Sequence, residues 1–387
     1  MNKILTLNNI SAKGLERLPR ENYEVSSECS SPDAILLRSF KMHDMDIPKS
    51  LLAVGRAGAG VNNIPLDKMS SKGIAVFNAP GANSNAVKEL VIAGMLLACR
   101  NLCHAWDYTN RLEGSDAKIS KDVEAGKKKY VGYELPGRTL GVIGLGAIGV
   151  KVANAARSLG MHVIGYDPGI SVQSAWNLSS DVEAIASVDD MMTKVDFVTL
   201  HVPLIPATKN LINAERLAHM KPGGVIMNFA REGIVDDQAV LDALESEHIH
   251  AYVTDFPSNL LKGKQGVINL PHLGASTREA EENCAIMVAD QLKDFLENGN
   301  VSNSVNFPSM HLARATGNRL AVVNSNMPDM VGQISHILGE NSLNIQRMAN
   351  ESRNELAYTL MDTDKPITPE IIESISKING VLSVRTL

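Results

Sequence analysis

The sequence has 387 residues, a net charge of −6 and 44% hydrophobic residues. Its mean hydropathy of −0.04 and the lack of an apolar run of roughly 18 residues exclude a membrane-spanning class and favour a soluble globular protein. The acidic charge, without a long basic run, argues against nucleic acid as a partner, and the length predicts two or three domains.

The N-terminal part alternates short apolar runs with polar stretches. Three of these runs predict parallel strands, at residues 34–37, 51–54 and 74–77. Residues 88–103 predict a long buried helix because they are mostly apolar. A polar stretch, 114–137, leads from this helix to the next strand.

A strand, a glycine-rich turn and a helix follow. Residues 140–143 predict a buried strand, and the next glycines have the spacing G-x-G-x-x-G. Such glycines allow a tight turn, let the backbone approach a pyrophosphate and let the helix pack against the strand, while the helix N-terminus attracts the anion. The residues of this turn that are expected to form the cofactor site are Gly144, Gly146, Ala147, Ile148 and Gly149.

The next predicted strand, residues 162–166, ends just before Asp167. This carboxylate lies 18 residues after Gly149, close to the roughly 20 expected for an acid that binds the ribose hydroxyls of a dinucleotide. A negative charge here would repel a 2′-phosphate. The sequence therefore predicts NAD rather than NADP as the cofactor.

Strands and helices continue to alternate after Asp167. Further strands are predicted at residues 197–202, 224–228, 251–254 and 267–270, and helices at 237–247 and 277–298. Such alternation predicts an α/β fold with doubly wound parallel sheets. We expect residues 1–86 and 285–300 to form a substrate-binding domain and residues 87–284 to form a Rossmann NAD-binding domain.

The composition changes after residue 300. Residues 301–317 lack periodicity and predict a linker. Residues 318–387 predict a separate domain with the order βαββαβ, which is typical of a ferredoxin-like fold. Its strands are expected at 320–324, 344–349, 356–361 and 381–385, and its helices at 330–340 and 368–378.

Three polar residues follow predicted strands of the second domain: Arg231, Asp255 and His272. Open α/β sheets bind ligands at the carboxyl ends of their strands. An arginine suits a carboxylate in two-point contact, and a histidine can take the proton of an alcohol. Together with a dinucleotide site, they indicate hydride transfer at the hydroxyl-bearing carbon of a hydroxy acid. The alternative is a structural role, in which Arg231 pairs with a surface acid and His272 is a loop residue.

Several motifs resemble the D-isomer-specific 2-hydroxyacid dehydrogenases. They are the glycine-rich turn, LHVP at 200–203, MKPG at 220–223, NFAREG at 228–233 and PHLGAST at 271–277. The runs 55–64 and 78–84 are similar to the branch of that family that acts on phosphoglycerate. The resemblance implies NAD-dependent oxidation of D-3-phosphoglycerate to 3-phosphohydroxypyruvate, the first step of serine biosynthesis.

The same resemblance implies roles for individual residues. Arg231 would bind the substrate carboxylate and C2 oxygen, and His272 would be the general acid and base. Further cofactor contacts would come from His201, Pro203, Ala230, Asp255, His272 and Gly274. Further substrate contacts would come from Arg38, Ser39, Arg56, Gly58, Asn83 and, across a dimer interface, Lys129. The alternative for Lys129 is a solvated lysine on the surface.

One departure from the family pattern concerns the catalytic histidine. The family usually places a glutamate shortly after the aspartate, within D-V-F-x-x-E-P, where it increases the basicity of the histidine. Here the run 254–260 reads TDFPSNL, and its counterpart is Asn259 or Leu260. Neither carries a charge. Pairing the phenylalanines of the two runs would align Thr254, instead of Asp255, with the family aspartate.

The C-terminal domain resembles an ACT domain, a module that pairs with a second copy and binds amino acids. The resemblance implies an L-serine effector at Asn324, Asn326 and Asn344, although Asp329 stands where the family often has glycine. The alternatives are a domain used only for dimer contacts, and asparagines that only form turns.

Other functions are compatible with the same motifs. One is reduction of another 2-oxo acid, such as hydroxypyruvate, glyoxylate or 2-oxoglutarate, and another is a non-catalytic NAD-sensing interaction protein. Four scattered cysteines without a zinc-like spacing indicate reduced thiols and no metal site. The reduced thiols predict a cytoplasmic location, and the family resemblance implies a homodimer or homotetramer.

Overall fold

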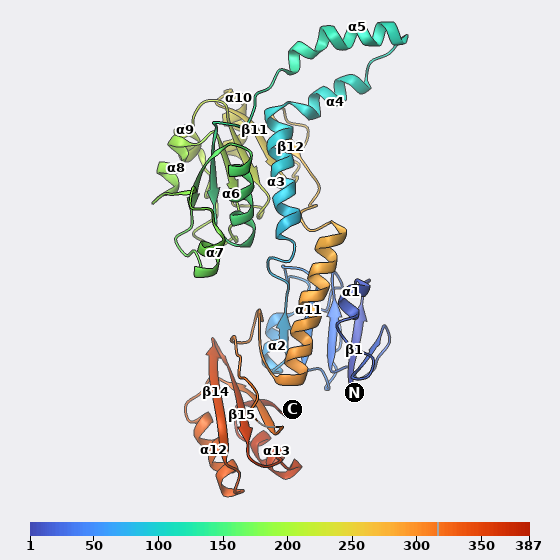
Figure 1. The fold of residues 1–387 in the computed structure, drawn as a ribbon, viewed down its shortest axis with the longest axis vertical. Helices are drawn as coiled ribbons and strands as arrows, with labels where there is room; N and C mark the ends of the chain where they lie inside the picture. Colours follow the sequence, from blue (N-terminus) through green and yellow to red (C-terminus); the bar gives the residue numbers. More distant parts are fainter. Residues whose placement is uncertain (316) are drawn as a thin grey trace. The chain divides into compact units, whose positions relative to one another are not determined.

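The computed structural model describes residues 1–315 and 317–387. They form two compact units, which we call the first unit (Met1–Asn83 and Arg278–Leu387) and the second unit (Ser84–Thr277) (Figure 1). Across both described stretches, no helix is sufficiently long and apolar for a membrane span.

The first unit contains a parallel five-stranded sheet in the order β2-β1-β3-β4-β5. Its strands are β1 (Asn2–Leu7), β2 (Tyr23–Ser26), β3 (Ala34–Leu37), β4 (Ala53–Arg56) and β5 (Ala75–Phe77). Alternate residues serve the two faces: Leu36 packs toward the long helix α11 (Arg278–Asn298), and Leu37 packs toward α2 (Leu66–Ser71). The sequence patterns did not identify β1 and β2. Strand β4 is shifted by two residues toward the C-terminus relative to the predicted strand 51–54.

Helix α11 lies against the sheet and against α1 (Ala12–Leu15). A Cβ atom at Gly14 would come within 2.5 Å of the Ala285 side chain, so only glycine allows these helices to lie so close. On β4, Gly55 similarly leaves space for Val288 and Leu292. One face of the N-terminal sheet is thus covered by a helix from much later in the chain.

The second unit contains a seven-stranded parallel sheet in the order β12-β11-β10-β9-β6-β7-β8. Its strands are β6 (Thr139–Ile143), β7 (His162–Tyr166), β8 (Glu183–Ala184), β9 (Phe197–Leu200), β10 (Gly224–Asn228), β11 (Ile249–Thr254) and β12 (Val267–Asn269). The strand order reverses between β6 and β9, where doubly wound sheets bind their ligands. The predicted α/β fold with doubly wound parallel sheets is confirmed.

Helices cover both faces of this sheet (Figure 1). One face packs against α3 (Ser84–Cys99) and α6 (Ala147–Ser158). The other face packs against α8 (Val188–Lys194), α9 (Ala214–His219) and α10 (Asp237–Glu245). A short helix, α7 (Val172–Asn177), precedes β8.

The segment after α3 differs from the prediction. The predicted helix 88–103 was wrong at its end, because Asn101 adopts a left-handed conformation (φ 51°) that breaks it. The chain continues as α4 (Leu102–Asn110), α5 (Asp116–Gly126) and the 3₁₀-helix η1 (Lys127–Tyr130). We call residues 102–130 the arm. Trp106 on α4 is 72% exposed, and no described residue of α4 is buried.

The C-terminal domain has the predicted order βαββαβ. Its elements are β13 (Arg319–Ser325), α12 (Met330–Glu340), β14 (Ile345–Arg353), β15 (Leu356–Thr363), α13 (Pro369–Ser376) and β16 (Val381–Thr386). The antiparallel sheet has the order β14-β15-β13-β16, and both helices cover one of its faces. The ferredoxin-like fold is therefore confirmed.

The second face of this sheet joins the core of the first unit. Its side chains Val323, Tyr358 and Leu360 belong to the same buried cluster as Phe77 and Phe295. The segment expected to be a linker takes part in this cluster. It forms no helix or regular strand in its described residues, yet it buries Val301, Phe307 and Met310. The C-terminal domain is thus packed onto the N-terminal sheet and not loosely tethered to it.

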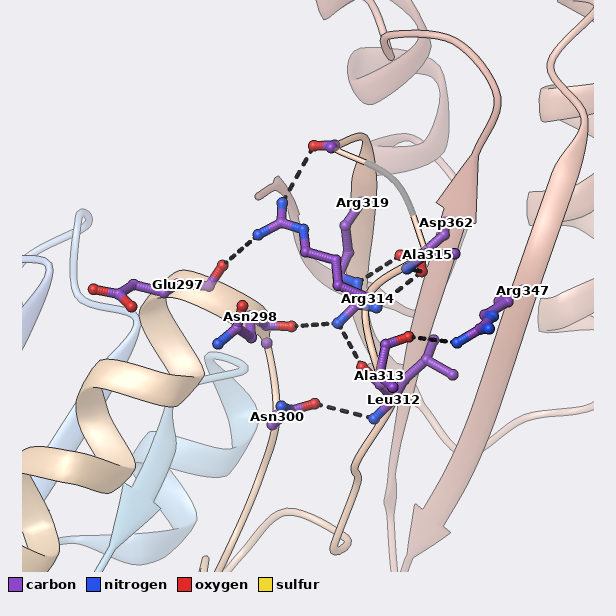
Figure 2. Close-up of polar contacts among 12 residues, drawn as sticks. Glu297, Asn298, Asn300, Leu312, Ala313, Arg314, Ala315, Arg319, Arg347 and Asp362 are labelled. Atoms are coloured by element: carbon purple, nitrogen blue, oxygen red, sulfur yellow. Dashed lines mark hydrogen bonds and ion pairs between the residues drawn. The ribbon is translucent and has the colours of Figure 1, made fainter.

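The C-terminal end of α11 is capped by the C-terminal segment (Figure 2). The last carbonyl groups of a helix have no partner within it, and cations are favourable there. Donors to these carbonyl oxygens are Arg385 to Phe295 (2.5 Å) and Leu296 (3.4 Å), Arg314 to Glu297 (3.0 Å), Arg319 to Asn298 (2.9 Å) and Tyr358 to Gly299 (2.7 Å). This interface is polar as well as apolar.

A buried ion pair lies beside this cap (Figure 2). Arg319 and Asp362 are both fully buried and form a two-point contact, with Nε–Oδ1 at 2.6 Å and Nη2–Oδ2 at 2.9 Å. The Ala315 N–H also donates to Asp362, at 2.9 Å. Burial raises the pKa of Asp362, but these hydrogen bonds outweigh it and hold the pKa below its usual value.

Candidate active site

The glycine-rich turn links β6 to α6 as the sequence predicts. Gly144 has φ 92°, and a Cβ atom there would lie 2.6 Å from the His201 carbonyl oxygen. Gly149 packs directly onto the carbonyl group of Gly144, which leaves no room for a side chain. Gly146 caps α6 with open space beside it, since a Cβ atom would meet no protein atom within 4 Å. The N-terminal N–H groups of α6 therefore face a volume that a ligand can occupy.

Asp167 lies at the end of β7 and holds this turn in place. Its carboxylate accepts hydrogen bonds from the N–H groups of Leu145 (2.8 Å) and Gly169 (2.9 Å). Asp167, Gly144 and Pro203 line one cavity of about 440 Å³. A dinucleotide that bound here would meet the carboxylate next to the glycine-rich turn.

The sequence patterns missed two charged residues that line this cavity. Arg216 and Asp189 form an ion pair across 2.7 Å, which lowers the pKa of Asp189. Arg216 also donates to the Leu211 carbonyl oxygen, at 2.7 Å. Both residues come from helices on the face opposite α6, so only the folded chain shows that they lie near Asp167.

His201 follows β9 and is held in a neutral form. Its Nε2 lies 3.1 Å from the Thr199 hydroxyl, and its Nδ1 is buried without a partner among the described residues. Burial lowers the pKa of His201 to about 3. A neutral imidazole presents one donor and one acceptor, so the unpaired nitrogen can serve a ligand.

Arg231 is carried by a tight loop after β10. Asn228, only 1% exposed, holds this loop by donating to the Arg231 carbonyl oxygen (2.9 Å) and accepting from the Ala230 N–H (3.1 Å). The guanidinium of Arg231 is exposed and donates to the Ala230 carbonyl oxygen, at 2.6 Å. Asn228 lies within the NFAREG motif, but its side-chain role could be seen only in the fold.

Asp255 and His272 follow the neighbouring strands β11 and β12. Asp255 is 2% exposed, whereas His272 is exposed on its loop. The aromatic ring of Phe256 packs edge-on against the imidazole, with ring centroids 5.0 Å apart. Thr254, the alternative to Asp255, is fully buried, and its hydroxyl accepts a hydrogen bond from the Phe256 N–H. The geometry therefore favours Asp255 as the acidic residue next to the histidine.

The first unit places two arginines at the carboxyl edge of its sheet. Arg38 follows β3 and Arg56 ends β4, and these strands are neighbours in the sheet. Arg56 Nε donates to the Arg38 carbonyl oxygen (3.0 Å), and Arg38 pairs with Glu281 of α11 (2.8 Å). Glu281 was not predicted, because it is close to Arg38 only in the folded chain. Two arginines at the ends of neighbouring strands supply the kind of groups that suit a multiply charged oxyanion such as a phosphate.

Of the other predicted substrate residues, Ser39 and Gly58 lie beside these arginines, whereas Asn83 and Lys129 belong to other parts of the fold. The Ser39 N–H donates to the Asn8 side chain (3.0 Å), and Gly58 leaves room for the Arg56 guanidinium, which a side chain there would overlap. Asn83 directly precedes α3. Lys129 is exposed on the arm of the second unit and does not line the 440 Å³ cavity.

Of the predicted effector residues, Asn324 lies near the end of β13, Asn326 follows that strand, and Asn344 directly precedes β14. Asn324 is buried, and its Oδ1 lacks a partner among the described residues. Asn326 donates to the Asn354 carbonyl oxygen (3.1 Å), and the Asn344 N–H donates to Asp364 (2.8 Å). Asp329 has φ 67°, so it keeps the left-handed backbone that glycine favours.

A larger cavity lies at the opposite end of the second unit's sheet. Its volume is about 750 Å³, and Gly223, Ile249 and Gly266 place it at the amino ends of β10, β11 and β12. Ligands of doubly wound sheets bind at the carboxyl ends. The smaller cavity beside the glycine-rich turn is therefore the candidate cofactor site.

Comparisons with known proteins agree with this geometry. Residues 92–274 match the family described as D-isomer specific 2-hydroxyacid dehydrogenase, NAD binding domain. A D-3-phosphoglycerate dehydrogenase of Methanocaldococcus jannaschii is 37% identical over 296 residues, which cover 74% of this chain and 54% of the archaeal protein. That of Escherichia coli K12 is 32% identical over 352 residues, covering 88% of this chain and 82% of its own length.

A solved structure is similar as well. The NAD⁺-bound 3-phosphoglycerate dehydrogenase of Entamoeba histolytica has a TM-score of 0.60 and 25% identity, covering 79% of this chain and 98% of its own. The Thermus thermophilus protein TT0316 has a TM-score of 0.63 at 25% identity, and the match covers 78% of this chain and 99% of the Thermus chain.

Proposed function

This chain belongs to the D-isomer specific 2-hydroxyacid dehydrogenases, and we propose that it oxidises D-3-phosphoglycerate to 3-phosphohydroxypyruvate with NAD as cofactor. The observation that carries the proposal is the pair of arginines, Arg38 and Arg56, at one sheet edge. A hydroxy acid with a single carboxylate needs one guanidinium, supplied by Arg231, whereas a phosphorylated one needs further cationic groups. Relatives from an archaeon and a bacterium bear the name of this activity.

Each residue has a distinct task in this reaction. The Arg231 guanidinium binds the substrate carboxylate and polarises the C2 oxygen, and His272 removes the proton of the C2 hydroxyl. NAD, when bound at the glycine-rich turn, supplies the acceptor for the hydride of C2. In the reverse direction, His272 returns the proton to the oxygen.

The direct test is a coupled assay. The protein is incubated with NAD, 3-phosphoglycerate and a reagent that traps the keto product, and NADH absorbance is recorded. NADH formation supports the proposal. Intact NAD binding without NADH formation would contradict it and would favour the NAD-sensing alternative.

Replacing Arg38 or Arg56 with glutamine should raise KM for 3-phosphoglycerate by roughly 10-fold or more, because a charge-assisted hydrogen bond contributes about 1.5–3 kcal/mol. KM for the unphosphorylated analogue glycerate should change little. Arg17→Gln is the matched control, since Arg17 is an exposed arginine of the same unit that pairs with Asp290 on α11. An equal effect on both substrates would favour a reductase of unphosphorylated 2-oxo acids.

Replacing Asp167 with alanine should narrow the preference for NAD over NADP by about 10-fold or more. The change removes the carboxylate that binds the ribose hydroxyls and repels a 2′-phosphate, and it leaves Arg216 in the same cavity. The two dissociation constants can be measured by calorimetry. A preserved ratio would show that Asp167 does not select the cofactor.

The proposed assembly and regulation use other surfaces. The arm exposes Trp106, and we infer that it contacts a second copy of the chain in a homodimer or homotetramer, which sedimentation velocity would detect. Lys129 would reach the partner's substrate from this arm.

We assign the C-terminal domain to the ACT class with an L-serine effector at Asn324, Asn326 and Asn344, and calorimetry with L-serine tests this assignment.

A further inference from the structure

A buried carboxylate oxygen in the second unit lacks a partner. Asp255 Oδ1 is buried and accepts no hydrogen bond from any described residue. Unpaired buried polar atoms are uncommon in folded proteins, and those that persist often have a functional reason. We therefore look for a partner among the groups that leave the same edge of the sheet as Asp255.

His272 is that group by its position in the fold. Strands β11 and β12 are parallel neighbours, and the Leu270 N–H donates to the Thr254 carbonyl oxygen at 2.8 Å. The residues that follow these two strands therefore leave the sheet side by side. The ring of Phe256 contacts the imidazole, and a Cβ atom at Gly274 would lie 4.0 Å from Asp255 Oδ2. Asp255 thus lies among the immediate neighbours of His272.

The charges around Asp255 agree with this placement. The titratable groups that act on it are His272, Arg231 and, on β11, the Tyr252 hydroxyl. Burial raises the pKa of Asp255, and the positive charges of His272 and Arg231 lower it. Such an interaction is reciprocal, so an ionised Asp255 stabilises a protonated imidazole.

We propose that Asp255 takes the place of the glutamate that this chain lacks and serves as the positioning residue for His272. During the reaction, we expect its unpaired Oδ1 to accept a hydrogen bond from the imidazole and to stabilise the imidazolium that forms when the C2 hydroxyl loses its proton. The inference rests on the proposed function. The counterparts of the glutamate, Asn259 and Leu260, are exposed and uncharged.

Asp255→Asn is the first test, because it keeps the shape of the side chain and removes its charge. We expect kcat for 3-phosphoglycerate oxidation to fall by about 10²-fold. The acidic limb of the pH–kcat profile should move to lower pH, since the imidazolium that forms in the reaction loses its stabilising charge. Asp255→Glu should return the limb toward its original position. Asp237→Asn is the matched control, because Asp237 is a partly buried acid of the same unit that does not act on His272.

Two results of the kinetic test would overturn the proposal. One is an Asp255→Asn protein with the kcat and pH profile of the original chain. The other is a higher dissociation constant for NAD with kcat and the pH profile unchanged, which would restrict Asp255 to cofactor binding.

A second test needs neither activity nor cofactor and uses the His272→Gln variant, which changes an exposed side chain and leaves the core residues in place. Carbon-13 NMR follows the Asp255 carboxyl carbon through a pH titration. The midpoint should rise in this variant because a positive charge has been removed, and identical midpoints would overturn the proposal. If the original chain forms no NADH, the proposed function fails, while this titration still decides whether Asp255 and His272 interact.

Discussion

Replacing His272 with alanine should lower kcat for 3-phosphoglycerate oxidation by about 10²-fold or more, the usual contribution of a positioned general acid or base. Without the imidazole, the C2 hydroxyl proton has only water to accept it. His272 is exposed on its loop, so its removal leaves the sheet and the glycine-rich turn intact. Steady-state kinetics with calorimetric NAD binding will separate loss of chemistry from loss of cofactor.

The control for this variant is His162→Ala. His162 is exposed at the start of β7, at the amino end of the sheet, where no reaction takes place in our proposal. Its kcat should match that of the original chain. If His272→Ala retained full kcat as well, the proton would have to leave by another group, and the assignment of His272 would be wrong.

Replacing Asp362 with alanine should lower the free energy of unfolding of the first unit by about 3–5 kcal/mol, the usual cost of breaking a buried ion pair. The change leaves the Arg319 guanidinium fully buried with an uncompensated charge. It also removes the acceptor for the Ala315 N–H. Urea unfolding monitored by far-ultraviolet circular dichroism will measure the effect.

Glu373→Ala is the matched control in the same domain. Glu373 pairs with Lys377 on the exposed surface of α13, and such pairs contribute about 0–1 kcal/mol. The same chemical change should therefore have a much smaller effect. Equal effects of the two substitutions would contradict the claim that burial makes the Asp362 pair important.

The stabilisation by Asp362 should also depend on pH. Because the folded chain holds the pKa of Asp362 below its usual value, this stabilisation is complete above about pH 4. It declines as the pH falls further and the carboxyl group takes up a proton in the folded chain.

The sequence predicted the sheets well where apolar runs were continuous. The strands β3, β7 and β10 have the predicted bounds. Strands β3 and β10 are buried along their whole length and β7 at its centre, and each ends at or just before a polar residue. The prediction failed at β1, whose first residues are polar, and at the start of the arm, where the left-handed Asn101 interrupts the predicted helix 88–103. Period and composition do not show a left-handed backbone at one asparagine.

For the candidate site, the sequence could indicate the functional residues but not the neighbouring side chains that hold them in place. Arg231 and His272 were visible because each follows a predicted strand. Asn228, Glu281 and Phe256 were not, since their importance depends on contacts made only in the fold: a loop hydrogen bond, an ion pair from a distant helix and a ring contact. The segment 301–317 was judged by its polar composition, and its few apolar residues proved to be core residues.

The cap on α11 also limits how this protein can be altered or recombined. A chain cut short at residue 318 would lose three donors to the end of α11, Arg319, Tyr358 and Arg385. It would also expose Phe77, Phe295 and Phe307 to water. Such a fragment would be prone to aggregate. The C-terminal domain therefore cannot simply be exchanged between proteins. Fusing it to another dehydrogenase would require redesigning the helix end and the core of that dehydrogenase together.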